Sequence, residues 1–180
     1  MSNNTLMFTA TEHGQAMYDK VKAFIETHIE PIEAQFWQDC HKQNPDGNWK
    51  NWQWPEKYES LRKQAREAGL WNLFLPDDTL GAGLSVTDYA PIAELTGRSL
   101  LAPYVFNCNA PDSGNMELLW RYGSQEQQEK WLTPILDGKT RSVFCMTEPD
   151  VASSDATNMQ ATAVVDGDEI IINGSKWWSS

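Results

Sequence analysis

The sequence has no run of Lys or Arg anywhere among its 180 residues, and its formal net charge is −11. Binding of nucleic acid needs a basic stripe that neutralises phosphates, so the composition argues against this class of partner. No apolar run is long enough to span a bilayer. The opening segment MSNNTLMFTATEHGQ lacks the basic and apolar regions of a secretory signal. We therefore predict a soluble, cytoplasmic protein without a membrane span.

Cysteine is also scarce. Cys40, Cys108 and Cys145 are odd in number, lie far apart and form no CxxC pair. This pattern is typical of free thiols in a reducing compartment, and it predicts neither a disulfide framework nor a metal site. Hydrophobic residues nevertheless make up 41% of the chain and charged residues 22%, which is the composition of a globular domain.

The first three quarters of the chain have the apolar spacing of helices. Apolar residues at three- and four-residue steps predict a helix over residues 11–40, kinked or split at Pro31. Ser124 and Gln127 have the spacing of a capping box at the start of the last helix, which Gly138 should end. Three further helices are expected, and Pro91 should fall in the first turn of the second of these. They cover residues 55–69, 88–96 and 115–122.

After Gly138 the pattern changes to short β-branched and aromatic runs, which predict strands over 141–147, 159–165, 169–174 and 175–178. Asp166-Gly167 predicts a hairpin, and Asn173-Gly174 is a second candidate turn. Helices followed by strands predict an α+β fold that is mainly α, with a boundary near Lys139. So few strands would leave open edges, so we expect the sequence to be a piece of something longer.

The segment FCMTEPDVASSDATN, residues 144–158, carries the chemistry. Ser153, Ser154 and Asp155 can present several N–H and O–H donors to one anion, such as a pyrophosphate. The alternative is a solvated loop whose side chains satisfy only their own backbone. Trp177-Trp178, followed by small hydroxyl residues, could wall a flat aromatic ring or simply pack in a sheet.

MTEPDVASSDATN resembles the first motif of the acyl-CoA dehydrogenase family, whose usual form is close to LTEPGAGSD. The resemblance extends from about Ala23 to the last residue, through AREAGLWNLFLPDD, GAGLSVTDYAPIAELTGRS, YGSQEQQEKWLTPILDGKTRS and DEIIINGSKWWSS. It implies an N-terminal all-α domain over 1–139 and the start of a β-barrel-like middle domain over 140–180. The C-terminal helical domain of the family would be absent.

The resemblance also implies a flavin site. Ser154 matches the motif serine, which contacts the FAD pyrophosphate and lies near the acyl-CoA; the longer PDVASSD loop leaves open whether Ser153 or Ser154 faces the ligand. Trp178 matches the tryptophan beside the flavin. The implied FAD contacts are Phe144, Cys145, Met146, Thr147, Glu148, Ser153, Ser154, Trp178, Ser179 and Ser180. No catalytic residue is assigned, because the family's base is a glutamate of the C-terminal domain.

The implied activity is FAD-dependent α,β-dehydrogenation of an acyl-CoA thioester in fatty acid β-oxidation. Electron-transfer flavoprotein would be the acceptor, and the protein would form a homodimer or homotetramer. Acyl-CoA oxidases, flavin monooxygenases and nitroalkane oxidases share this architecture and stay open. The alternative from another class is a non-catalytic helical module or fragment that binds partners or oligomerises.

Overall fold

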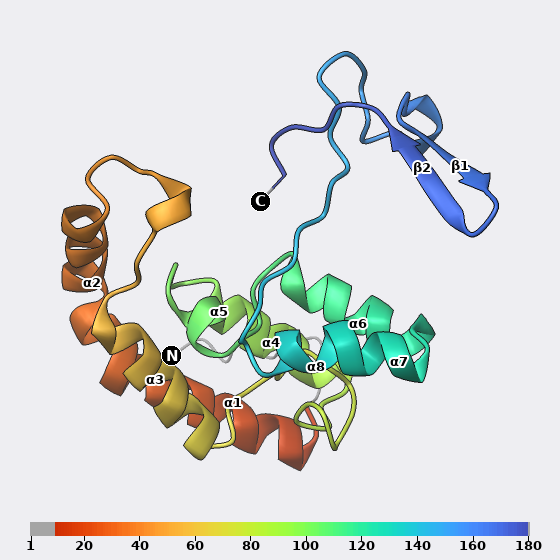
Figure 1. Cartoon of the computed structure of the whole chain (residues 1–180). Coiled ribbons are helices and arrows are strands. Elements are labelled where there is room, and N and C mark those ends of the chain that lie inside the picture. The colour runs from red at the N-terminus through yellow and green to blue at the C-terminus, as the bar shows by residue number, and fades with distance from the viewer. Residues whose placement is uncertain (1–9, 180) are drawn as a thin grey trace.

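The computed structural model describes residues 10–179, with all their side chains except that of Trp49. Its first helical segment consists of α1 (Glu12–Phe24), a π-helical turn η1 (Ile25–Ile29) and α2 (Glu30–Gln43), shown in red to orange in Figure 1. The Thr11 hydroxyl caps α1 by accepting a hydrogen bond from the Gly14 amide at 3.0 Å. The interruption predicted at Pro31 takes the form of the π turn, in which the Glu30 amide donates to the Ile25 carbonyl. This wider turn precedes a proline that has no N–H to continue the α-helical ladder.

Two further helices are α3 (Glu56–Glu67) and α4 (Val86–Thr96). Gly69 ends α3 as predicted, with φ of +71°. The Ser85 hydroxyl caps α4 by accepting from the Asp88 amide at 3.1 Å, so this helix begins two residues before the predicted start. The expectation that Pro91 lies in the first turn is therefore wrong, because Pro91 lies inside the helix.

The remaining helical segments are α5 (Ala102–Val105), which the apolar spacing did not predict, α6 (Asp112–Tyr122), α7 (Gln125–Gln127), a second π turn η3 (Gln128–Leu132) and α8 (Thr133–Leu136). Two 3₁₀ turns, η2 (Trp49–Asn51) and η4 (Ala156–Asn158), lie in loops. The capping box is confirmed: the Gln127 amide donates to the Ser124 hydroxyl at 3.2 Å, and the Ser124 amide donates to Gln127 Oε1 at 2.9 Å.

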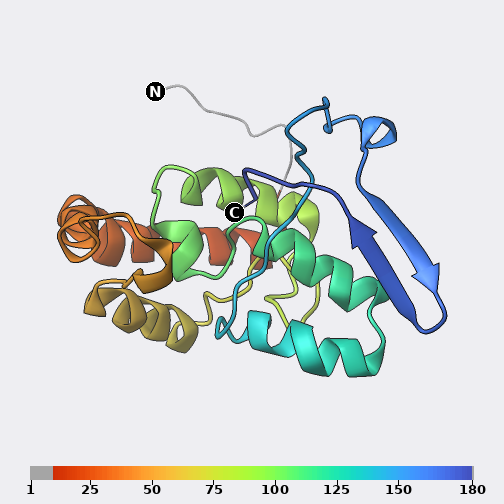
Figure 2. The same ribbon diagram turned by 45° about the horizontal axis from the view of Figure 1, so that its top comes forward.

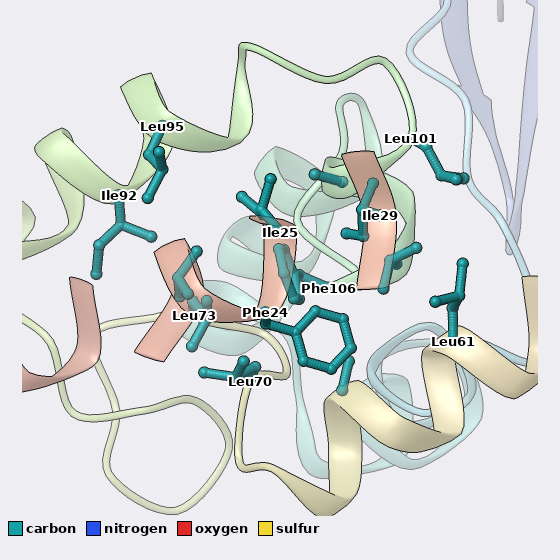
Figure 3. Packing of buried hydrophobic residues seen from close by; sticks show 14 of the residues in the cluster. Phe24, Ile25, Ile29, Leu61, Leu70, Leu73, Ile92, Leu95, Leu101 and Phe106 are labelled. Atoms are coloured by element: carbon teal, nitrogen blue, oxygen red, sulfur yellow. The ribbon is translucent and has the colours of Figure 1, made fainter. Parts of the chain in front are cut away.

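The helices pack around one main apolar core, shown in Figure 3. Its residues come from α1, η1, α2, α3, α4, α5 and the connections between them, so segments far apart in the sequence share one interior. The labelled members are Phe24, Ile25, Ile29, Leu61, Leu70, Leu73, Ile92, Leu95, Leu101 and Phe106. A smaller cluster joins α6, η3 and α8, and consists of Leu75, Met116, Leu132, Ile135 and Leu136.

A buried pair of asparagines links the two clusters. Asn107 donates to the Asn72 side-chain oxygen at 2.7 Å and to the Ile135 carbonyl at 3.0 Å. Both asparagines adopt positive φ, a conformation that asparagine tolerates better than most side chains. The pair thereby adds hydrogen bonds to backbone carbonyls at the end of α8, where the Ile135 carbonyl also accepts from the Gly138 amide.

The strands β1 (Thr162–Asp166) and β2 (Glu169–Asn173) form an antiparallel hairpin in which Val164 is opposite Ile171. The predicted turn is confirmed, with Gly167 at φ of +61°. Figures 1 and 2 show this hairpin standing away from the helices, at the end of a long connection. The fold is mainly helical, with one small antiparallel sheet in the part of the chain that the structure describes.

The strands predicted over 141–147 and 175–178 are wrong, since neither segment is part of a sheet. A strand needs a partner along its length, and a single backbone bond joins these two segments, from the Trp177 amide to the Thr147 carbonyl at 3.1 Å. Asn173-Gly174 ends β2 without forming a second hairpin. Among residues 10–179, no helix is long and apolar enough to cross a bilayer.

Candidate functional site

The connection between the helices and the hairpin is anchored at Asp112, at the start of α6. This buried carboxylate accepts hydrogen bonds from the Ser142 amide at 2.7 Å and the Ser142 hydroxyl at 2.6 Å, and it pairs with Arg141. The anchor fixes where the chain leaves the helical domain. Residues 143–147 then lead, without helix or strand, to the donor-rich loop.

Glu148 lies at the centre of this loop, with its side chain only 6% exposed. One carboxylate oxygen accepts from the Gln160 amide at 2.7 Å, and the other accepts from the Ala161 amide at 3.0 Å and from Lys176 Nζ at 2.9 Å. The hydrogen bond from Lys176, together with the two backbone amides, lowers the pKa of Glu148 to about 2. Glu148 is therefore an anion that ties the loop to both ends of the hairpin.

Lys176 completes the arrangement, although the sequence analysis did not assign it a role. Its ammonium group donates to Glu148 and to the Met146 carbonyl at 3.1 Å, and it lies 3.7 Å from the Met159 sulfur. Trp177, which follows Lys176, donates its amide to the carbonyl of Thr147, which follows Met146. The sequence does contain a signal for this role, because Lys176 lies between an apolar strand and two tryptophans. A lysine in such a position is half-buried and needs hydrogen-bond acceptors nearby.

The two serines of the loop have different environments. Ser153 is buried, and its hydroxyl accepts from the Glu148 amide at 2.8 Å. Ser154 is exposed. Of the two, Ser154 is thus the residue whose side chain is accessible to a ligand. The side chain of Asp155 bonds within the loop itself, in agreement with the alternative of a solvated loop. Its carboxylate accepts hydrogen bonds from the Thr157 hydroxyl and amide, and these lower the pKa of Asp155.

The aromatic residues predicted for the site are exposed. Phe144 is 59% exposed and Trp178 is 83% exposed, while Trp177 and Trp178 contact each other with ring centroids 6.2 Å apart. Trp178 has φ of +53°, a conformation that costs a bulky residue energy and recurs at functional sites.

The other predicted residues surround the same junction. Cys145 is exposed, and Met146 and Thr147 are half-buried. The Ser179 hydroxyl donates to the Trp177 carbonyl at 3.4 Å. Ser180 lies outside the described residues. The structure thus brings Thr147, Glu148 and Ser153 together with the segment that carries Trp177 and Trp178.

The helices that carry this junction match a known domain. A family model for "Acyl-CoA dehydrogenase, N-terminal domain" matches residues 11–139. The chain belongs to the acyl-CoA dehydrogenase family. The family resemblance carried by the TEPDVASSDATN segment is therefore confirmed.

Curated and solved members of the acyl-CoA dehydrogenase family extend this result. The chain is 50% identical over 175 residues to acyl-CoA dehydrogenase family member 11 of Gallus gallus, which covers 97% of this chain and 22% of that protein. A structure of a putative acyl-CoA dehydrogenase from Mycobacterium abscessus is 56% identical with a TM-score of 0.87, covering 96% of this chain and 43% of the other. A glutaryl-CoA dehydrogenase from Mycobacterium smegmatis in complex with FADH2 shares the fold, at 24% identity and a TM-score of 0.60 over 94% of this chain and 39% of the other. The chain thus spans about a fifth of the length of the chicken relative that it matches.

Proposed function

We propose that the 180 residues form the N-terminal helical domain, over 1–139, and part of the flavin pocket, over 140–180, of a FAD-dependent acyl-CoA dehydrogenase. The observation that carries this proposal is the junction at Thr147. There the loop bearing the exposed Ser154 is joined to the segment bearing Trp178 by a backbone hydrogen bond and by the contacts of Lys176.

The residues present fit an FAD molecule. A flavin ring needs a flat apolar surface and hydrogen-bond donors at its edge, and exposed indoles next to the Thr147 backbone offer both. The pyrophosphate needs donors, and Lys176 is the sole Lys or Arg from residue 142 to residue 180. Because Lys176 is already paired with Glu148, we assign pyrophosphate binding to the Ser154 hydroxyl and neighbouring amides.

FAD, when bound, supplies the electron acceptance that dehydrogenation of the α,β bond of an acyl-CoA thioester requires. The chain would orient the ring with Phe144, Cys145, Met146 and Thr147 on one side and Trp178 with Ser179 and Ser180 on the other. Ser154 would lie near the acyl-CoA. We further propose electron-transfer flavoprotein as the acceptor and a homodimer or homotetramer as the assembly.

None of these residues is proposed as the base that removes the α-proton. Glu148 is the one carboxylate among the predicted FAD contacts, but its oxygens accept hydrogen bonds from Lys176, Gln160 and Ala161. A carboxylate held with a pKa of about 2 is a weak proton acceptor. We therefore propose that the base comes from another part of the protein.

Flavin binding by the complete gene product tests the proposal. The purified protein should show flavin absorbance, and Ser154→Ala and Trp178→Ala should each lower the content of bound FAD. Ser60→Ala on α3 and Trp131→Ala on η3 are matched controls, because both residues are exposed on the helical domain. A protein that stays colourless after addition of FAD would favour the non-catalytic module, whose best support is the exposed apolar hairpin.

A further inference from the structure

We propose that Glu148 and Lys176 are positioning residues for the flavin: their ion pair holds the Trp177–Trp178 segment against Thr147 without either side chain touching the cofactor. This inference rests on the proposed function and adds a residue, Lys176, that is not among the implied FAD contacts. It also gives Glu148 a role through its neighbours, in place of a direct contact between its carboxylate and FAD.

The first step of the argument is that the pair is fully engaged within the protein. The Glu148 side chain is 6% exposed, and its two oxygens accept the three hydrogen bonds described above. The Lys176 ammonium has three N–H groups and three neighbours, namely the Glu148 carboxylate, the Met146 carbonyl and the Met159 sulfur. Neither charge is left to pair with a bound ligand.

The second step concerns alignment. Lys176 binds the carbonyl of Met146, and Trp177 binds the carbonyl of Thr147, so two consecutive residues of one segment bind two consecutive carbonyls of the other. This matched pairing sets the position of Trp178 along the loop. Since neither segment belongs to a sheet, no ladder of further hydrogen bonds duplicates this function among the described residues.

The third step is that Glu148 also fixes the hairpin. The amides of Gln160 and Ala161, which lead into β1, both donate to its carboxylate. Lys176 follows β2 by three residues, so the ion pair closes the open end of the hairpin onto the loop. Loss of the lysine would leave the buried Glu148 carboxylate without its partner, and loss of the carboxylate would leave the half-buried Lys176 without its partner, so the closure would open in either case.

The test uses the complete gene product with bound FAD and three variants: Glu148→Gln, Lys176→Met and the double variant. We expect the dissociation constant for FAD to rise on the order of 100-fold in each single variant, which is the effect of breaking a buried pair. The double variant should lose no more affinity for FAD than either single variant, since each single substitution already removes the same closure. At saturating FAD, the absorption spectrum and the reduction potential of the flavin should change in all three.

The direction of the potential shift separates positioning from simple electrostatics. Glu148→Gln leaves an extra positive charge and Lys176→Met an extra negative charge, so a purely electrostatic influence would shift the potential in opposite directions. Loss of positioning should shift it in the same direction in both. Asp88→Asn is the matched control, because this buried carboxylate accepts hydrogen bonds from the Ser85 hydroxyl at 2.7 Å and from the Thr11 amide at 2.8 Å, both in the helical domain. It should lower folding stability and leave the flavin spectrum unchanged.

The outcomes are distinct. Wild-type affinity, spectrum and potential in both single variants, or potentials that shift in opposite directions at unchanged affinity, would overturn the positioning role and leave the proposed function standing. A wild-type protein that binds no FAD would overturn both. If Glu148→Gln does not fold, Lys176→Met and the double variant still decide the question, because a loss of affinity in both supports the inference and native affinity in either refutes it.

Discussion

The helical region and the segment after it are stabilised by different forces. In the part of the chain that the structure describes, the buried apolar side chains all belong to residues 17–136, where they form the two clusters of the helical domain. After Leu136, the buried residues of the described chain are Glu148 and Ser153, and both are polar. The helical domain therefore carries its own hydrophobic core, whereas the geometry of the loop over residues 144–158 depends on hydrogen bonds and one ion pair.

The hairpin sharpens this contrast, because it is apolar but not buried. The register places Ala163, Val165, Ile170 and Ile172 on one face, and the three larger side chains of this face are 63–75% exposed. Exposed apolar side chains contribute little to the stability of the chain that carries them. Substitutions that are matched between the two regions should therefore have very different effects.

The largest difference is expected between Phe106 and Ile172. Phe106 is fully buried, so Phe106→Ala should lower the free energy of unfolding by about 3–5 kcal/mol. Ile172→Ala on the hairpin should change it by less than about 0.5 kcal/mol. Urea denaturation followed by circular dichroism measures both. A large loss from Ile172→Ala would show that the hairpin is packed in solution and would break the comparison.

The second comparison uses two glycines with nearly equal backbone angles, Gly138 at φ of +63° and Gly167 at φ of +61°. A Cβ at Gly138 would collide with the Arg62 guanidinium and lie 3.0 Å from the Trp71 ring, whereas a Cβ at Gly167 meets no atom within 4 Å. Gly138→Ala should therefore cost about 2–4 kcal/mol, the sum of overpacking and backbone strain. Gly167→Ala should cost about 1 kcal/mol, from strain alone. Equal losses in urea denaturation would mean that Arg62 moves aside freely.

The same division explains how far the sequence alone predicts the structure. Features set by neighbours along the chain were predictable: the apolar period of the first helix, the Ser124 capping box and the Asp166-Gly167 turn. The start of α4 was misplaced, because Ser85 was not recognised as its cap. The strand expected over 141–147 is wrong because a strand needs a partner, and sequence patterns carry no information about which segment supplies one.

The candidate site follows the same rule. The family resemblance points to Ser154 and Trp178, whose contacts with a flavin stay a prediction. The roles of Glu148 and Lys176 depend on hydrogen bonds that span 12 to 30 residues, and no local spacing encodes them. The exposure of Ser154 and the burial of Ser153 also come from folding of the loop around Glu148.

A moderate effect is expected at the cap of the last helical segment. Ser124→Ala removes the acceptor for the Gln127 amide and should lower the free energy of unfolding by about 1 kcal/mol. Ser175→Ala, next to Lys176, is the counterpart in the exposed region, and it should have no measurable effect on global unfolding. Thermal unfolding of the two variants distinguishes them, and a matching loss at Ser175 would contradict the division between the regions.

The smallest effect on global unfolding is expected from acid. The pKa of Glu148 falls from 4.5 to about 2 on folding, so its contribution is fully present above pH 4.5 and is lost as the pH falls toward 2. Because this carboxylate holds a segment with little buried surface, its protonation should release residues 175–179 before the helices unfold. Hydrogen exchange at the Trp177 amide measures the release. In Glu148→Gln the same amide should exchange rapidly already at neutral pH, and protection that persists in this variant would contradict the assignment.

Each of the two π turns is equivalent to one extra residue inserted into an α-helix, and each is followed by a proline that disfavours the regular α-helical form. In each turn, the residue before the proline donates its amide five positions back, from Glu30 to Ile25 ahead of Pro31 and from Thr133 to Gln128 ahead of Pro134. Deleting one residue from either turn would return the helix to an uninterrupted α form and keep the downstream faces in register with the core. The proline ring would then collide with the carbonyl four residues earlier, so the shortened helix should be more stable when the proline is replaced as well.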